Sequence, residues 1–269
     1  MKPDASKNRV TAAFMAGILL CASACAAPGG LEEKLPSDPE SLPQQTGPSR
    51  PESAEATPQP APSEPDAPWQ SATAEPFEFR GFVDIAEVDP RIVIDCRYAT
   101  ENNYTGKKQY PFGLSLLRRE AAQRLKNAQD TAAGMGCRLV IFDAYRPLGV
   151  QQSLYDAMPD SLKAFVAKPG KNSPHGVGLT VDCGLADLDG NLLEMPSEFD
   201  TFDISASVGY TGGTTEQRRH RDLLVTLMQD AGFSVYSAEW WHYSAPNPNG
   251  YEASNFSFED FVDARSAAI

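Results

Sequence analysis

Two of the chain's three histidines lie in segments that are rich in glycine or tryptophan and also carry a carboxylate. His175 precedes Asp182 in the run Ser-Pro-His-Gly-Val-Gly-Leu-Thr-Val-Asp, and His242 follows Glu239 in the run Glu-Trp-Trp-His. Catalytic zinc usually takes three protein ligands and keeps one position for water, and two histidines with one carboxylate form a common set. The pattern predicts one Zn2+ per chain, held by His175, Asp182 and His242, with Glu239 free to act as general base and then acid.

Arg146 is the second candidate catalytic group. It follows the apolar run 138–145, which predicts a strand, and strand ends hold side chains rigidly. A fixed guanidinium beside zinc would stabilise the negative charge that develops on a carbonyl oxygen under attack. The alternative is a surface ion pair with Asp143, which would contribute only ~0–1 kcal/mol.

The other histidines and aromatics have simpler interpretations. His220 lies in the polar run 215–222, which predicts a solvated surface residue. Trp240 and Trp241 are interpreted as packing groups that shape and dry the site. His175 and His242 could each be a hydrogen-bonded core histidine, but the nearby carboxylates favour metal ligation.

The two ligand segments are expected to be loop and strand. Three glycines between residues 176 and 184 argue against a helix, and Leu179–Val181 has β character. The run 233–243 is rich in aromatic and β-branched residues and predicts a strand. In a regular strand Glu239 and His242 would face opposite sides, so a bulge or strand end is expected at residues 240–241.

Five separated blocks occur in a specific order: Tyr98–Thr100 with Asn103–Gly106, Asp143–Pro147, Ser173 through Asp182, Phe199–Asp200, and Glu239–Tyr243. Together they resemble the D-Ala-D-Ala dipeptidase family of zinc peptidases. That family includes the vancomycin-resistance dipeptidases and is related to D,D-carboxypeptidases and LAS-type peptidases. The resemblance covers about residues 77 to 262. Thr180, where members often carry alanine, and Pro174, just before His175, are the visible departures.

The resemblance implies roles for individual residues. It makes His175, Asp182 and His242 the zinc ligands. Glu239 becomes the general base and Arg146 the electrophilic helper. The substrate-binding residues that it implies are Asp200, which would hold the substrate's free ammonium, and Ser173 and Tyr98, which would line the dipeptide pocket.

The N-terminus predicts export. Lys2, Lys7 and Arg9 precede the apolar run 12–24, which is too short for a confident membrane span. The small residues before Cys25 resemble a bacterial lipoprotein box, although Ala22 replaces the usual leucine. We expect residues 1–25 to be a signal peptide, Cys25 to be lipidated, and the protein to be a membrane lipoprotein on the extracytoplasmic side. The alternatives are cleavage after Ala24 or Ala27 with secretion, or an uncleaved anchor.

Residues 26–76 predict a disordered tether. Twelve of the chain's 22 prolines lie between residues 28 and 76, where nine acidic and two basic residues give a net charge of −7 out of −13. Such a segment cannot bury enough apolar surface to fold, and like charges extend it. The acidity of the chain argues against nucleic-acid binding, which needs the opposite charge.

Residues 77–269 are long enough for one domain with its own core, which the resemblance identifies as the zinc peptidase domain. Strand patterns at 91–96 and 138–145, and helix patterns at 115–133, from 147 and at 214–231, do not alternate strictly. The fold class predicted is α+β, with helices packed on a small, largely antiparallel sheet and the zinc site at its face. Among Cys96, Cys137 and Cys183 at most one disulfide can form in an oxidising compartment.

The leading functional hypothesis is zinc-dependent hydrolysis of D-alanyl-D-alanine to D-alanine, with a small peptide as partner. Its rival is a D,D-carboxypeptidase that trims terminal D-Ala from longer wall peptides. A carboxylate at Asp200 that clamps a free ammonium favours the dipeptidase, whereas export favours the carboxypeptidase. A domain that binds wall peptide without cutting it is disfavoured by the intact ligand set and Glu239.

Overall fold

The computed structural model describes residues 75–269. The predicted signal peptide, the lipidation site Cys25 and nearly all of the predicted tether lie outside the described residues. Among residues 75–269, no helix combines the length and the apolar character needed to cross a membrane.

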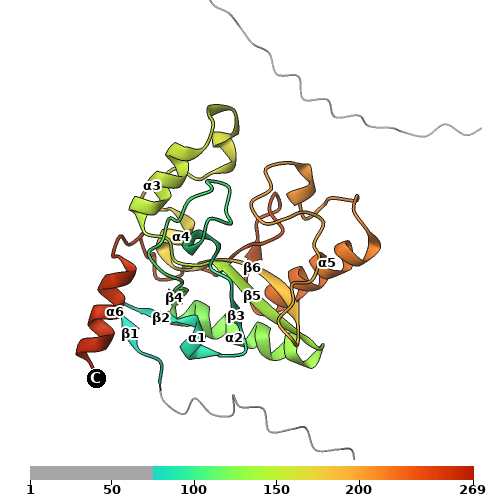
Figure 1. The fold of residues 1–269 in the computed structure, drawn as a ribbon. Helices are drawn as coiled ribbons and strands as arrows, with labels where there is room; N and C mark the ends of the chain where they lie inside the picture. The colour runs from blue at the N-terminus through green and yellow to red at the C-terminus, as the bar shows by residue number, and fades with distance from the viewer. Residues whose placement is uncertain (1–74) are drawn as a thin grey trace, which may run out of the picture. The chain divides into compact units, whose positions relative to one another are not determined.

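A five-stranded sheet carries the ligand segments (Figure 1). Its strand order is β3-β5-β6-β8-β7, and only the β3–β5 pair is parallel. The strands are β3 (Val93–Ile94), β5 (Cys137–Asp143), β6 (Thr180–Asp187), β7 (Ser234–Val235) and β8 (His242–Ser244). The predicted α+β class with a largely antiparallel sheet is therefore confirmed.

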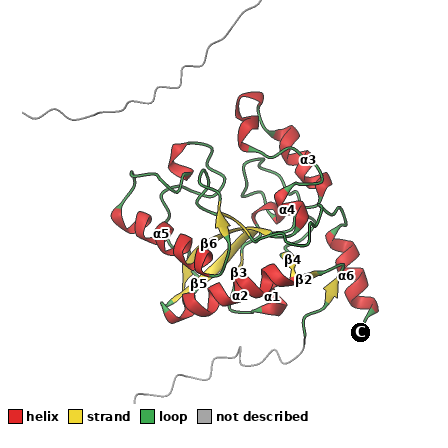
Figure 2. Cartoon of the chain, turned by 180° about the vertical axis from the view of Figure 1, so that it is seen from behind, coloured by secondary structure: helices red, strands yellow, loops and turns green. Residues whose placement is uncertain are grey.

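Two helices cover one face of this sheet. They are α2 (Arg119–Gly134) and α5 (Thr215–Asp230), which contact each other as well as the sheet (Figures 1 and 2). Val181 and Cys183 of β6 share a buried apolar cluster with both helices. Because successive side chains of a strand point to opposite faces, Asp182 points away from α2 and α5. The opposite face of the sheet is thus the one available for a site.

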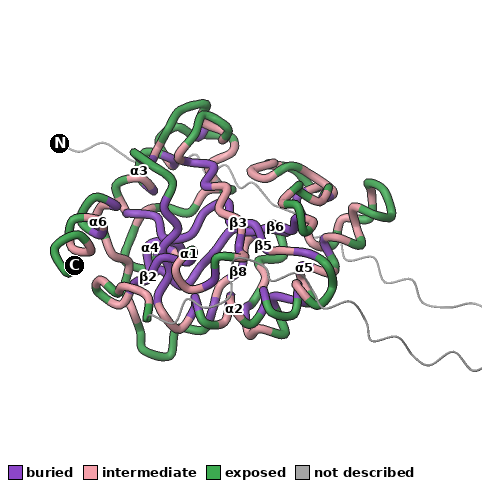
Figure 3. Tube along the Cα trace, turned by 60° about the horizontal axis from the view of Figure 1, so that its bottom comes forward, coloured by how far each residue is buried: buried purple, intermediate pink, exposed green. Residues whose placement is uncertain are grey.

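A smaller sheet lies beside the first and was not predicted. It has the order β1-β2-β4, from β1 (Glu78–Phe79), β2 (Phe82–Asp84) and β4 (Leu116–Arg118), all antiparallel. An aromatic cluster that includes Phe82, Tyr145 and Phe256 packs it against α6 (Phe258–Ala267). Figure 3 shows that buried chain runs through the strands, with exposed segments in the outer loops.

The remaining elements are short and lie in the connections. They are α1 (Ile85–Val88), α3 (Leu148–Ala157), α4 (Pro174–Val177) and the 3-10 helices η1 (Arg97–Ala99), η2 (Asp160–Phe165) and η3 (Ile204–Ala206). The helix predicted to start near Pro147 corresponds to α3, because Pro147 is the residue immediately before this helix.

Three local predictions were wrong. The predicted helix 115–133 begins at Arg119, because Leu116–Arg118 instead pair with β2. The segment after Ser173 is a one-turn helix, α4, which Gly178 ends in a left-handed conformation. The predicted single strand 233–243 is instead a hairpin, in which a turn over residues 236–241 joins β7 to β8. The strand end that was expected near residues 240–241 is present, because β8 begins at His242.

His220 is less exposed than expected, and the three cysteines of the described residues are unpaired. The His220 side chain is only 15% exposed, because its Nδ1 contacts the Glu194 carbonyl at 2.8 Å and its Nε2 lies 3.1 Å from Glu216. Cys96, Cys137 and Cys183 are buried and free, so no disulfide joins any of the three.

Candidate metal centre and active site

The three predicted metal ligands lie together. One ligand atom from each of His175, Asp182 and His242 lies within 4.8 Å of the others. His175 Nε2 is 3.3 Å from Asp182 Oδ2, and His242 Nδ1 is 3.0 Å from Asp182 Oδ1. Two imidazole nitrogens and one carboxylate oxygen are a donor set that suits zinc.

The backbone places these ligands from three segments. Asp182 and His242 are directly opposed in the β6–β8 ladder, so their side chains emerge on the same face. His175 reaches them from α4, whose end depends on Gly178 at φ +80°. A Cβ at this position would lie 2.1 Å from Phe82 Cε1, so only glycine permits the close approach of α4 to β2.

A hydrogen bond to the backbone fixes the orientation of the His175 imidazole. His175 Nδ1 lies 2.7 Å from the Ala144 carbonyl, which can only accept, so Nδ1 carries the proton and Nε2 is left for a metal. Burial alone would raise the pKa of Asp182, but His175 and His242 hold it well below its ordinary value. The carboxylate is therefore ionised near neutral pH, as a metal ligand must be.

Glu239 lies beside the ligands without replacing one. It sits in the turn between β7 and β8, and its Oε2 is 3.7 Å from His242 Nδ1. Burial, reinforced by the nearby Asp182 and opposed by His242, raises the pKa of Glu239 to about 7. A carboxyl group with this pKa can both take and give a proton near neutral pH.

Arg146 is buried, which excludes the surface ion pair. Its Nε and Nη2 donate to Asp143 Oδ2 at 2.8 and 2.6 Å, and its Nη1 donates to Gln151 Oε1 at 2.8 Å. The Tyr110 hydroxyl donates to the other Asp143 oxygen at 2.7 Å. Burial would lower the pKa of Arg146, but Asp143 raises it well above its ordinary value. Three of the five guanidinium N–H groups are thus engaged, and two remain for the cavity.

Asp200 and Tyr98 form a pair on the cavity wall. The Tyr98 hydroxyl donates to both Asp200 oxygens, at 3.0 and 3.2 Å. Burial, together with the nearby Asp182, raises the pKa of Asp200 to about 8. Asp200 also has φ +61°, one of two positive values among the described non-glycine residues. Backbone strain of this kind is common at functional sites. At Asp200 it accompanies the contact between the carboxylate and the Tyr98 hydroxyl.

Ser173 is near the site but differs from the other predicted residues. It is buried at the start of α4, and its hydroxyl has no partner among the described residues. It does not line the cavity, whereas the next residue, Pro174, does. A buried hydroxyl without a partner is costly, so a small shift of α4 or a bound polar group would satisfy it.

All other predicted site residues line one cavity of about 250 Å³. Sequence reasoning missed part of this wall, chiefly Tyr104, Gln151, Phe165, Phe202 and Tyr236. Tyr104 was inside a recognised block and was available as a candidate. The other four carry no local signal, because they come from separate loops or helices. Trp241 packs as predicted and also contributes to the wall.

A second hollow of about 210 Å³ adjoins this cavity. It shares Tyr104 and Asp200 with the cavity and is otherwise lined by Arg97, Phe199 and the polar residues Glu101, Asn102, Asn103 and Glu198. Tyr104 and Asp200 therefore separate a small catalytic cavity from an open polar surface.

Comparison with known proteins identifies the family of the chain. A family model described as D-ala-D-ala dipeptidase, peptidase M15, matches residues 78–261. The D-alanyl-D-alanine dipeptidase of Escherichia coli K12 is 33% identical over 180 residues, covering 67% of this chain and 92% of that protein. The D-alanyl-D-alanine dipeptidase of Enterococcus faecium is 30% identical, covering 64% of this chain and 96% of that protein.

Among solved structures, the vancomycin-resistance D,D-dipeptidase VanXYg with a D-Ala-D-Ala phosphinate analogue is 22% identical. That match covers 58% of this chain and 62% of that chain, with a TM-score of 0.34. The family resemblance predicted from the sequence blocks is confirmed by the family model and by the full-length relatives. The chain belongs to the D-Ala-D-Ala dipeptidase family of peptidases.

Proposed function

We propose that this chain hydrolyses D-alanyl-D-alanine to two molecules of D-alanine, with one zinc ion held by His175, Asp182 and His242. The observation that carries the proposal is a small cavity whose wall combines a His-Asp-His donor set with Glu239, Arg146 and Asp200. The relatives named as D-alanyl-D-alanine dipeptidases support the same substrate.

The residues present fit zinc. His175 Nε2 is left free by the Nδ1 contact to Ala144, and Asp182 is ionised beside it. When bound, zinc supplies a Lewis acid that polarises a carbonyl and makes a water molecule easier to deprotonate.

Glu239 performs the proton transfers. Its carboxylate takes the proton of the attacking water and gives it to the departing amine of the second residue, so the group ends as it began. The pKa of about 7 that burial causes keeps both forms accessible near neutral pH.

Arg146 stabilises the developing negative charge. Asp143 and Gln151 fix the position of its guanidinium, and Arg146 lines the cavity with two N–H groups that have no other partner among the described residues. A donor fixed in this way costs no reorganisation when charge develops on the carbonyl oxygen.

Asp200 selects the free amino end. Its carboxylate lies on the cavity wall, and the Tyr98 phenol keeps its proton because burial raises the pKa of Tyr98. A substrate ammonium beside Asp200 would favour the ionised carboxylate and form a buried ion pair.

One observation favours the rival D,D-carboxypeptidase. The second hollow beyond Tyr104 and Asp200 offers polar surface on which the rest of a longer wall peptide could lie. The deciding experiment compares D-Ala-D-Ala, L-Ala-L-Ala, N-acetyl-D-Ala-D-Ala and a wall pentapeptide with zinc-loaded enzyme, each with and without a chelator. We expect chelator-sensitive cleavage chiefly of D-Ala-D-Ala. Preferred cleavage of the pentapeptide would establish the rival.

We also propose that the protein is exported and anchored by lipid at Cys25. The support is the basic start, the short apolar run 12–24 and the small residues before the cysteine. Such an anchor with an extended tether would leave the catalytic domain free to meet small peptides outside the membrane.

A further inference from the structure

Three aromatic side chains form one edge of the catalytic cavity. Tyr104, Phe165 and Phe202 all line it, and we call them the aromatic rim. The Phe202 ring centre lies 5.2 Å from that of Tyr104 and 5.9 Å from that of Phe165. These are distances at which aromatic rings interact. Tyr104 and Phe202 lie in two separate loops and Phe165 ends η2, so their contacts join segments that are distant in the sequence.

The aromatic rim lies at the Asp200 end of the cavity. Tyr104 packs edge-on against Tyr98 at 6.3 Å, and Tyr98 donates its hydroxyl to Asp200. Phe202 follows Asp200 by two residues, and Tyr104 and Asp200 together separate the cavity from the second hollow. A group attached to a nitrogen beside Asp200 would therefore meet the rim.

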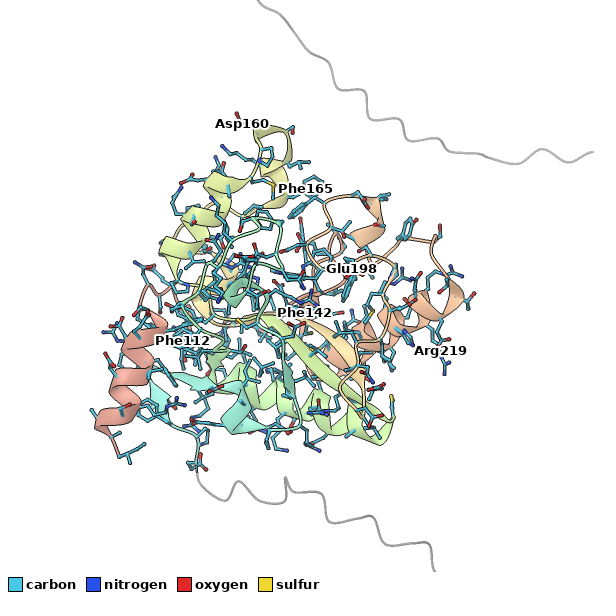
Figure 4. The ribbon with its side chains drawn as sticks, viewed as in Figure 1. Phe112, Phe142, Asp160, Phe165, Glu198 and Arg219 are labelled. Atoms are coloured by element: carbon cyan, nitrogen blue, oxygen red, sulfur yellow. The ribbon has the colours of Figure 1, made fainter. Side chains whose placement is uncertain are left out.

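The rim has one fixed member and one exposed member. Tyr104 is held by its hydroxyl, which donates to the Leu154 carbonyl at 2.8 Å. Phe165 is 43% exposed at the end of η2, on the side that faces the loop bearing Glu198 (Figure 4). Gln151 donates to the Ala167 carbonyl at 2.7 Å and so anchors the chain just after Phe165. Phe165 is therefore the member of the rim that meets solvent, whereas Tyr104 is fixed by a hydrogen bond.

We propose that the aromatic rim is a steric stop that admits a free ammonium at Asp200 and rejects any group attached to that nitrogen. The inference rests on the proposed function and adds a second selection to it. Asp200 selects the charge of the amino end, whereas the rim selects its size. The second hollow is then closed to the substrate by Phe202 and Tyr104, not open to a longer peptide.

The test separates size from charge. The substrates are N-formyl-, N-acetyl- and N-propionyl-D-Ala-D-Ala, which all lack the ammonium and differ only in the length of the acyl group. With wild-type enzyme we expect kcat/KM to fall by about tenfold or more with each added carbon. Phe202→Ala should remove most of this dependence on acyl length, because the space for the group is then open.

Phe165→Ala provides a second variant that should fold, since Phe165 is partly exposed. This substitution should also reduce the dependence of kcat/KM on the length of the acyl group. Phe112→Ala is the matched control, because Phe112 is 37% exposed but packs near Phe258 of α6, away from Phe165 (Figure 4). Asp200→Asn should lower kcat/KM for free D-Ala-D-Ala. It should leave the dependence of kcat/KM on acyl length among the three N-acyl substrates unchanged.

The outcomes distinguish the two proposals. If wild-type enzyme cleaves free D-Ala-D-Ala but both rim variants keep the wild-type dependence on acyl length, the steric stop is wrong and the proposed function stands. A zinc-loaded wild-type enzyme that does not cleave free D-Ala-D-Ala would instead refute the proposed function.

Discussion

Replacement of Asp143 tests whether Arg146 is held ready for catalysis by a buried ion pair. The Asp143 side chain is 1% exposed, and one of its oxygens accepts both Arg146 N–H groups, at 2.8 and 2.6 Å. Removal of one partner of a buried ion pair typically costs ~3–5 kcal/mol, since the other charge stays buried. Asp182 lies 3.7 Å from Arg146 Nη2 and would compensate part of that loss. We therefore expect Asp143→Ala to lower the free energy of unfolding by about 3 kcal/mol.

The assay is urea unfolding of the metal-free protein, because bound metal would add its own stabilisation. The matched control is Asp95→Ala, which breaks the 2.7 Å pair between Arg97 Nε and an Asp95 side chain that is 37% exposed. It should cost less than ~1 kcal/mol. In the zinc-loaded enzyme Asp143→Ala should also lower kcat by ~10²-fold, since the guanidinium is no longer aligned. Equal effects of the two variants on both measurements would refute this reasoning.

Four further predictions concern the site and the anchor. Glu239→Gln should retain zinc and KM while kcat falls by ~10²–10⁴-fold, as metal analysis and steady-state kinetics would show; lost zinc or near-normal turnover would exclude Glu239 as general base. His242→Ala should abolish tight zinc binding, which equilibrium dialysis measures, and full occupancy would remove His242 from the ligand set. The pKa of Asp200, about 8 in the folded protein, lies above its ordinary 3.8, so the folded state holds a proton that the unfolded state has released. Stability of the metal-free protein should therefore fall between pH about 4 and 8 more steeply than that of Asp200→Asn, and equal slopes in urea unfolding would contradict this burial. Cys25→Ala should release the native protein from membranes or block its processing, and wild-type protein found wholly in the soluble secreted fraction would refute lipidation.

The cluster of His175, Asp182 and His242 was predictable because few residue types can bind zinc. With three histidines in the chain, two beside carboxylates restrict the choice of ligands to one set, and the structure brings that set together. Helix α5 was also predictable, since the residue before it, Thr214, forms a capping box with Gln217, and both residue types are typical of this cap.

The wall of the cavity was less predictable, because it depends on contacts between distant segments. The sequence left open a surface ion pair between Asp143 and Arg146, because Tyr110, which donates a hydrogen bond to the buried Asp143, lies 33 residues away in the chain. The hairpin turn was missed for the same reason. Its composition favours a strand, but Trp240 donates its backbone N–H to Ala206, which only the folded chain brings near.

Asp182 and His242 are directly opposed in the β6–β8 ladder, so the donor set assembles only when these two strands pair in this register. A slip of β8 by one residue would turn His242 to the face covered by α2 and α5, and the donor set would be lost. Misaligned and correctly aligned chains would then differ sharply in metal affinity, although their secondary structure is nearly the same. Under the proposed zinc ligation, metal uptake by a newly folded chain would favour the aligned form, because the binding free energy would stabilise that form alone.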